Sequence, residues 1–208
     1  MRKYKFMIMY ENIVKSRMSW RRFDHCVNVC RVAGELAKKY GANKDKAMIA
    51  GMLHDITKES SLEYHMNIIR KFKIPITKHD TISKGILHSI TGSTYAEKVL
   101  RIRDRDIINA IKYHTTGREG MSLLEKVVFV ADFISEERDY QGVDRIRKCA
   151  WEDLDLGALA GLLFSINNLI KIKIPIHPNT VLAYNDIVIH RRRQFNSEQN
   201  PPFGKQNL

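Results

Sequence analysis

Apolar residues recur at spacings of three and four along most of this 208-residue chain, and this periodicity constrains the fold most strongly. Such spacing builds one face of a helix, whereas a half-buried strand alternates at every second residue. The clearest run precedes Gly41, a residue type that commonly follows a helix, and consists of Cys26, Val29, Cys30, Ala33, Leu36, Ala37 and Tyr40. No stretch of the sequence alternates for long enough to indicate a strand. The pattern therefore predicts an all-α fold.

Residues that commonly cap helices mark where further helices are expected to begin. Asn43 and Asp104 each precede an apolar periodic run, and the segments 60–63 and 122–125 have the spacing of a capping box. Pro178 suits the first turn of a helix. We expect a loop over 73–82 and helices that include the segments 26–40, 43–53, 60–72, 86–100, 104–114, 122–132 and 154–170.

Length and composition are those of one globular domain. Apolar residues make up 44% of the chain and charged residues 28%, which is typical of a folded protein of this size. We expect an N-terminal extension over residues 1–18, one helical domain over 19–190 and a disordered basic and polar tail over 191–208.

The sequence predicts a cytoplasmic protein without a membrane segment. The first residues lack a cleavable secretory pattern, and the longest apolar stretch, 156–166, is too short to cross a bilayer. The three cysteines, Cys26, Cys30 and Cys149, lack zinc-finger spacing and are expected to be free thiols in a reducing compartment.

The formal net charge of +12 points to anionic partners. A positive field concentrates polyanions, either phosphorylated small molecules or nucleic acid. No basic motif interleaved with aromatic residues is present in the sequence, so nucleic acid is the less favoured partner.

An ordered series of histidines and aspartates suggests a metal site. It centres on the pair His54-Asp55, at the end of an apolar helical run, and consists of His25, His54, Asp55, His88, His114 and Asp132. Four imidazoles and two carboxylates suffice for two divalent ions that share Asp55, and such ligands suit iron, manganese or zinc. Asp132 lies in the apolar run 127–134, where a buried carboxylate has to be paired or bound to metal. The remaining candidates His65, His79 and His190 are expected to lie at the surface.

Two adjacent metal ions are suited to phosphate chemistry. Ions roughly 3.5–4 Å apart hold a bridging hydroxide and clamp phosphate oxygens during attack. We expect Asp55, His54 and Lys58 to carry catalysis. The turn after His114 is expected to offer backbone N–H groups and hydroxyls to phosphate, so the substrate-binding candidates are Lys58, Thr115, Thr116, Gly117, Arg118 and Arg138.

These motifs resemble the HD-domain metallophosphohydrolase superfamily. Within it, the chain is most similar to the YqeK family of symmetrical diadenosine tetraphosphate hydrolases. The resemblance covers about residues 20–190 and is carried by the segments 22–25, 53–58, 86–88, 111–126, 131–134, 138–140 and 175–178. Departures from the family pattern are Ser89, where glycine is usual, and 135–137, where a glutamate-proline-glycine turn is usual.

The resemblance implies an HD-domain helical bundle that holds two divalent ions, with iron the metal associated with the family. It implies that His25, His54, Asp55 and Asp132 bind one ion and that His88 and His114 bind the second, with Asp55 bridging. It also implies attack of water at the central linkage of diadenosine tetraphosphate, giving two ADP. A homodimer is compatible with the sequence but is not indicated by it.

Three alternative functions fit parts of the same pattern. An HD-domain phosphohydrolase could act on another nucleotide, such as a nucleoside monophosphate or an alarmone. A mixed-valent diiron oxygenase could use the same ligands, and oxygen consumption would identify it. A non-catalytic nucleotide- or RNA-binding module would account for the charge but not for six potential ligands.

Overall fold

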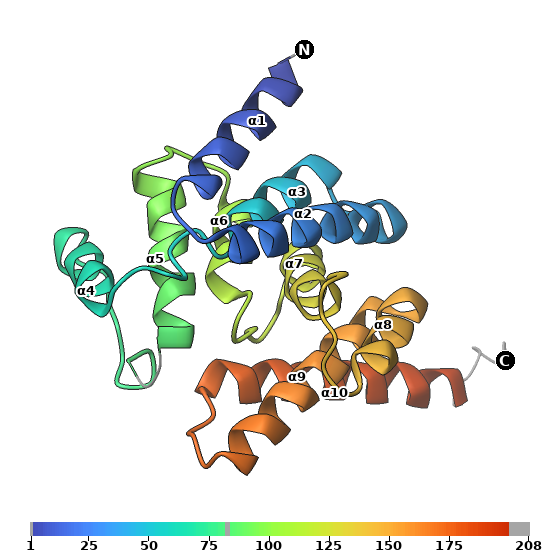
Figure 1. Cartoon of the computed structure of the whole chain (residues 1–208). Coiled ribbons are helices and arrows are strands. Elements are labelled where there is room, and N and C mark those ends of the chain that lie inside the picture. The colour runs from blue at the N-terminus through green and yellow to red at the C-terminus, as the bar shows by residue number, and fades with distance from the viewer. Residues whose placement is uncertain (1, 82–83, 200–208) are drawn as a thin grey trace, which may run out of the picture.

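The protein is a bundle of helices, seen here in a computed structural model that describes residues 2–81 and 84–199 (Figure 1). No strand occurs among these residues, so the predicted all-α fold is confirmed. The helices, in chain order, are α1 (Arg2–Lys15), α2 (Trp20–Tyr40), α3 (Lys44–Leu53), α4 (Leu62–Lys71), α5 (Lys84–Lys98), α6 (Arg105–Tyr113), α7 (Leu123–Ile134), α8 (Val143–Glu152), α9 (Leu154–Lys171) and α10 (Pro178–Gln199).

Most of the expected helix starts are confirmed. Asn43 and Asp104 cap α3 and α6 by accepting hydrogen bonds from backbone N–H groups, and Gly41 ends α2 in the left-handed conformation with φ 78°. Ser122 caps α7 as predicted. The capping box expected at 60–63 is wrong by one residue, because Ser61 is the residue that caps α4.

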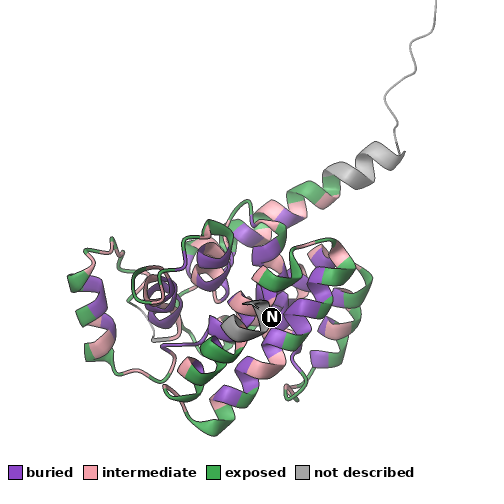
Figure 2. Cartoon of the chain, turned by 90° about the horizontal axis from the view of Figure 1, so that it is seen from above, coloured by how far each residue is buried: buried purple, intermediate pink, exposed green. Residues whose placement is uncertain are grey.

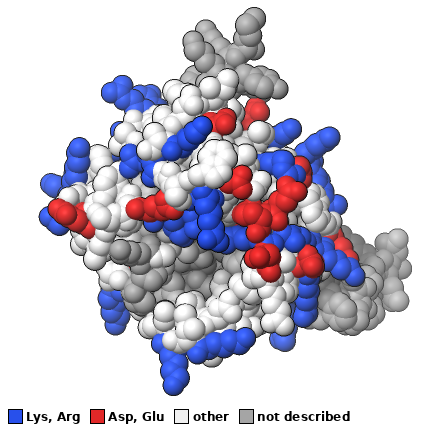
Figure 3. Space-filling model, in the orientation of Figure 1, with Lys and Arg blue, Asp and Glu red and all other residues white. Residues whose placement is uncertain are grey.

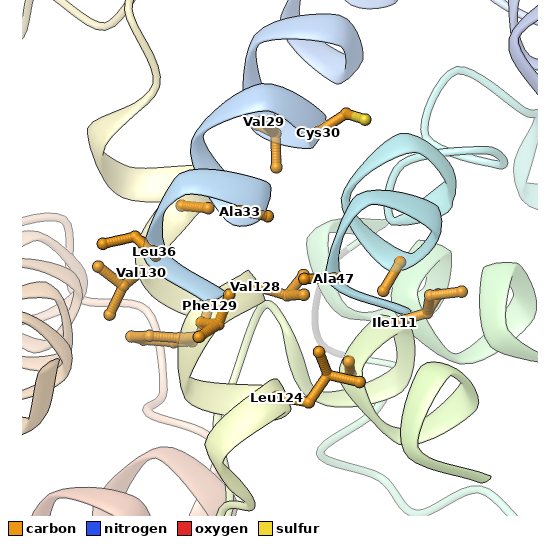
Figure 4. Packing of buried hydrophobic residues seen from close by; sticks show 14 of the residues in the cluster. Val29, Cys30, Ala33, Leu36, Ala47, Ile111, Leu124, Val128, Phe129 and Val130 are labelled. Carbon is orange, nitrogen blue, oxygen red and sulfur yellow. The ribbon is translucent and has the colours of Figure 1, made fainter. Parts of the chain in front are cut away.

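Helix α7 forms the centre of the molecule and contacts α2, α3, α6, α8 and α9. It is buried along most of its length, and Phe129 at its midpoint is 1% exposed. Figure 4 shows residues of α7 packing against apolar side chains of α2, α3 and α6. Burial of this kind stabilises the fold by roughly 25 cal/mol per Å² of apolar surface. Figure 2 shows how the buried positions follow the inward faces of the helices.

The structure shows helices at both ends of the predicted domain. The extension expected over 1–18 contains α1, which packs against α2 and α3 and places Tyr10 and Val14 in the core. The tail expected to be disordered from Arg191 begins as helix, because α10 continues to Gln199 and Arg191 pairs with Asp153 at 2.8 Å. Residues 200–208 lie outside the described residues. Helix α8 was not anticipated by the sequence pattern.

Helix α9 is long and apolar enough, by length and composition alone, to cross a membrane. This is weak evidence, because the core helices of water-soluble proteins can pass the same test. In this molecule α9 packs against α7, α8 and α10, and one of its faces, including Ala158 and Leu162, is fully buried.

Candidate metal centre

The fold brings all six predicted ligands to one place. Their side chains come from separate parts of the chain: His25 from α2, His54 and Asp55 from the end of α3, His88 from α5, His114 from the end of α6 and Asp132 from α7. Three overlapping groups of these residues place one ligand atom of each member within 4.8 Å of the others, as a metal ion requires. The cluster is therefore able to bind metal ions.

A close helix crossing sets the position of the His54-Asp55 pair. Gly51, one turn before His54, faces α2 so closely that an added Cβ would lie 3.0 Å from Cys30 Cα. A larger residue would push α3 away from α2, which carries His25. The small residue at position 51 thus keeps ligands from two helices within reach of one another.

The carboxylate of Asp55 lies between two pairs of imidazoles. Its Oδ2 atom faces Nε2 of His54 at 3.5 Å and of His25 at 3.8 Å. Its Oδ1 atom faces Nε2 of His88 at 2.8 Å and of His114 at 3.6 Å. One carboxylate with an oxygen toward each pair has the geometry of a bridging ligand.

Hydrogen bonds fix the orientation of the histidine rings. Nδ1 of His54 lies 2.7 Å from the carbonyl of Gly51, and Nδ1 of His114 lies 2.7 Å from that of Ile111. Since a carbonyl can only accept, each Nδ1 carries the proton and each Nε2 turns a lone pair toward Asp55. This is the arrangement that holds metal-binding histidines in proteins.

Asp132 is positioned by Arg138. Its Oδ1 lies 3.0 Å from Nε2 of His25, and Arg138 donates to the same oxygen at 2.5 Å and to the Asp132 carbonyl at 3.0 Å. Asp132 is only partly buried despite the apolar run around it, because its side chain is 20% exposed. It therefore forms the side of the cluster that is open to solvent.

The pKa values indicate that the carboxylates of Asp55 and Asp132 are anionic and that the imidazoles of His54 and His88 are neutral. Burial by itself would raise the pKa of the Asp55 carboxyl, but the surrounding histidines hold it well below its usual range. Burial opposes ionisation of Asp132 in the same way, and the hydrogen bond with His25 holds its pKa well below normal. Burial lowers the pKa of His54 and brings that of His88 to about 4. Neutral imidazoles and ionised carboxylates are the forms that bind metal.

Two buried atoms of the cluster make no hydrogen bond of regular geometry among the described residues, although one of them lies 2.8 Å from Nε2 of His88. They are Oδ1 of Asp55 and Nδ1 of His88. A buried polar group without a partner costs free energy, roughly 1–3 kcal/mol. A cation beside Oδ1 would remove that cost for Asp55, so the donor set fits divalent metal ions.

Positive side chains border the cluster. Lys58 Nζ lies 3.4 Å from Nε2 of His88 and 3.7 Å from Oδ1 of Asp55, and its side chain is 32% exposed. Arg22 donates to Oδ2 of Asp55 at 2.9 Å. Arg22 is not among the site residues expected from the sequence. Its position three residues before His25, one helical turn away on the same face, was the available signal.

The turn after α6 is arranged differently from the expectation. The N–H groups of Gly117 and Gly120 donate to Tyr113 and Asp186, so neither faces a phosphate site. Thr116 is buried and donates to the Gly117 carbonyl. Thr115 is the residue of the turn beside the cluster, with its hydroxyl 3.1 Å from Nε2 of His114.

Arg118 is occupied by an ion pair. Its Nε and Nη2 atoms each lie 2.7 Å from the carboxylate of Glu125, which is 2% exposed. The glutamate of the predicted capping box at 122–125 therefore binds Arg118. The two charges of this pair offset each other. The pair also fixes the turn against α7, which carries Glu125.

One of the remaining histidines is not at the surface. His65 is fully buried, with Nδ1 2.8 Å from the hydroxyl of Thr91, and Thr91 in turn contacts Thr57 at 3.0 Å. The surface position expected for it is wrong, whereas His190 is exposed as predicted. His79 is half-buried.

Comparison with known proteins identifies the family. The model of the HD domain matches residues 22–136. A Bacillus subtilis protein named symmetrical bis(5'-nucleosyl)-tetraphosphatase is 38% identical over 84% of this chain and 94% of its own length. One of the same name from Halalkalibacterium halodurans is 35% identical over 86% of this chain and 96% of its own.

A solved structure shares the fold as well as the sequence. It is described as a predicted HD superfamily hydrolase involved in NAD metabolism, from Clostridium acetobutylicum. It is 34% identical, superposes with a TM-score of 0.84 and covers 88% of this chain and 96% of its own. The chain therefore belongs to the HD-domain family of hydrolases, in the branch whose members are named symmetrical bis(5'-nucleosyl)-tetraphosphatases.

Proposed function

We propose that this protein hydrolyses diadenosine tetraphosphate at its central linkage and releases two molecules of ADP, using two divalent metal ions. The names of its relatives support the substrate and the reaction. The observation that carries the proposal for this chain is the placement of the two oxygens of Asp55 toward two different pairs of histidines.

In the proposed site, His25, His54, Asp132 and Asp55 would hold the first ion, while His88 and His114 would hold the second together with Asp55. Imidazole and carboxylate ligands suit iron, which we propose as the native metal. When bound, such a pair of ions lowers the pKa of a shared water and neutralises phosphate oxygens.

The protein itself orients the ligands and receives the polyphosphate. Asp55 would hold both ions and His54 the first of them, and Lys58 is exposed enough to contact phosphate oxygens beside them. We infer that Arg138 acts mainly through Asp132, and that Arg118 acts through the turn that it fixes. Thr115 remains a candidate phosphate ligand, because its hydroxyl lies at the edge of the cluster.

The surface charge supports an anionic substrate of small size. The formal net charge of +12 attracts polyphosphates from a distance. On the face shown in Figure 3, lysine and arginine side chains are scattered and interspersed with acidic ones. This distribution favours a compact polyanion over a long nucleic acid, for which a continuous basic stripe is typical.

Metal analysis together with product analysis tests the proposal. Freshly purified protein should contain about two ions per chain and should convert diadenosine tetraphosphate to ADP alone, faster than it hydrolyses any mononucleotide. Formation of AMP and ATP would refute the symmetrical reaction, and faster hydrolysis of a mononucleotide would refute the substrate. Asp24→Asn, on the exposed side of α2, serves as a control that should match the wild type.

A further inference from the structure

A cavity of about 290 Å³ opens beside the metal centre. It lies between the start of α5, the turn after α6, the second half of α9 and the segment that leads into α10. Its walls are formed by both polar and apolar side chains, among them Thr115, Phe164, Ser165, Asn168 and His177. Pockets for small molecules usually measure roughly 300–1,000 Å³, so this one has room for one nucleoside rather than two.

Thr115 connects the cavity to the metal centre. Its hydroxyl lies 3.1 Å from Nε2 of His114, and the same residue lines the cavity. A nucleotide whose phosphates lie at the cluster can therefore extend its nucleoside into the cavity without crossing another structural element.

The rings of Phe164 and His177 form parts of the cavity wall that neighbouring residues hold in place. Phe164 packs against Tyr140, with ring centroids 4.4 Å apart, and against Phe133 at 6.2 Å. His177 is 8% exposed, and both of its ring nitrogens are engaged. Its Nδ1 accepts from the N–H of Asn179 at 3.1 Å, so Nε2 carries the proton and donates to Asp80 at 3.2 Å. His177 can thus offer its ring surface to a base but neither nitrogen.

Asn168 offers the amide that the rest of the wall lacks. It follows Phe164 by four residues and Ser165 by three, so the three side chains share one face of α9. Within the described parts of the chain, its side chain makes no hydrogen bond. An asparagine amide both donates and accepts, which matches the adjacent acceptor nitrogen and amino group of adenine.

We propose that this cavity binds one adenosine of the substrate and that Asn168 reads the edge of its adenine. This inference rests on the proposed function, because it takes the phosphates to lie at the cluster. Guanine presents a different edge, on which the ring N–H and the amino group are both donors. A carboxylate at position 168 would accept from both of these groups and would repel the acceptor nitrogen of adenine.

Exchange of Asn168 tests the proposal through base preference. Asn168→Asp should lower kcat/KM for diadenosine tetraphosphate and raise it for diguanosine tetraphosphate, shifting their ratio roughly ten- to hundredfold, as expected for a bidentate base contact. Asn167→Asp is the matched control, because it makes the same chemical change at the preceding position of α9, which is exposed like Asn168 but does not line the cavity. It should leave the ratio unchanged.

Different results would refute the proposed function and the role of Asn168 in base reading. If the wild type does not cleave diadenosine tetraphosphate, the proposed function fails. If it does, and Asn168→Asp behaves like Asn167→Asp, the base-reading role of Asn168 is overturned. A second measurement uses no catalysis: metal-free protein should bind ADP more weakly after Ser165→Phe, which fills the cavity. Equal ADP affinity in that variant and the wild type would overturn the cavity as the nucleoside site.

Discussion

The carboxylate of Glu137 contacts Nδ1 of His25, the ring nitrogen opposite the one that faces Asp132. Burial lowers the pKa of His25, but its hydrogen bonds with Asp132 and Glu137 raise it to about 8. Such a contact behind a ligand holds the ring in place and increases its basicity. We expect Glu137→Gln to weaken metal binding at the His25 side roughly ten- to hundredfold, measured by metal titration of the chelator-treated protein.

Glu136→Gln is the control for this prediction. Glu136 is the neighbouring residue, its side chain is 73% exposed, and it pairs with Arg31 on the surface. Its exchange should leave metal affinity unchanged. Equal affinities in the two variants would show that Glu137 does not support the site.

Removal of the shared ligand should disable both metal positions. We expect Asp55→Ala to lose both ions and all measurable hydrolysis while its circular dichroism stays that of a helical protein. The reason is that each oxygen of this carboxylate faces a different pair of histidines. Turnover above a few per cent of the wild-type rate would contradict a bridging role.

The two proposed positions should be separable by mutation. His88→Ala or His114→Ala should each lower the metal content by about one ion per chain, because both residues face Oδ1 of Asp55. His25→Ala should instead affect the position on the Oδ2 side. Complete loss of metal in every variant, measured by elemental analysis, would mean that the two positions load only together.

The two threonines of the turn should respond differently. Thr115→Val removes the hydroxyl beside the cluster, and we expect the KM for diadenosine tetraphosphate to rise by roughly tenfold with full metal content. Thr116→Val removes a hydroxyl that already donates to the Gly117 carbonyl. It should change stability more than KM. A larger rise in KM for Thr116→Val than for Thr115→Val would assign the phosphate contact to Thr116 instead.

Gly117 should be needed for the shape of the turn. Its φ is +63°, and an added Cβ would lie 3.1 Å from Cβ of Ala183 in α10. Gly117→Ala should lower the free energy of unfolding by about 1–2 kcal/mol or more, since the backbone strain and the close contact add together. Gly120→Ala is the control, because Gly120 has φ +64° but no atom within 4 Å of the added Cβ. Chemical denaturation of both variants separates the contact from the strain.

The sequence predicted which residues come together as metal ligands, but it did not predict the exposure and the contacts of each one. His54 and Asp55 are adjacent in the chain, and the other ligands lie on or at the ends of periodic helices, so their convergence followed from pattern and family resemblance. Exposure was harder to infer. His88 and His114 are buried, whereas the side chain of Asp132 is 20% exposed although the residue lies in an apolar run.

Contacts between distant segments account for most of the remaining differences. Arg118 has the charge of a phosphate ligand, yet Glu125 neutralises it across the turn. Glu137 lies in a segment that departs from the family pattern, yet it orients His25. His65 lies in a helix of mixed polarity, and it is buried where its Nδ1 contacts Thr91 of α5. Such pairings depend on how the helices pack, which spacing along one helix does not reveal.

The six ligands lie on five different stretches of the chain, so any ion they hold also ties those stretches together. A ligand that binds only the folded chain adds to its stability in proportion to the logarithm of the ligand concentration. The melting temperature of the protein should therefore track the supply of its metal. In a metal-starved cell, unloaded chains would unfold more often and be degraded sooner, so the abundance of this enzyme would itself report metal status.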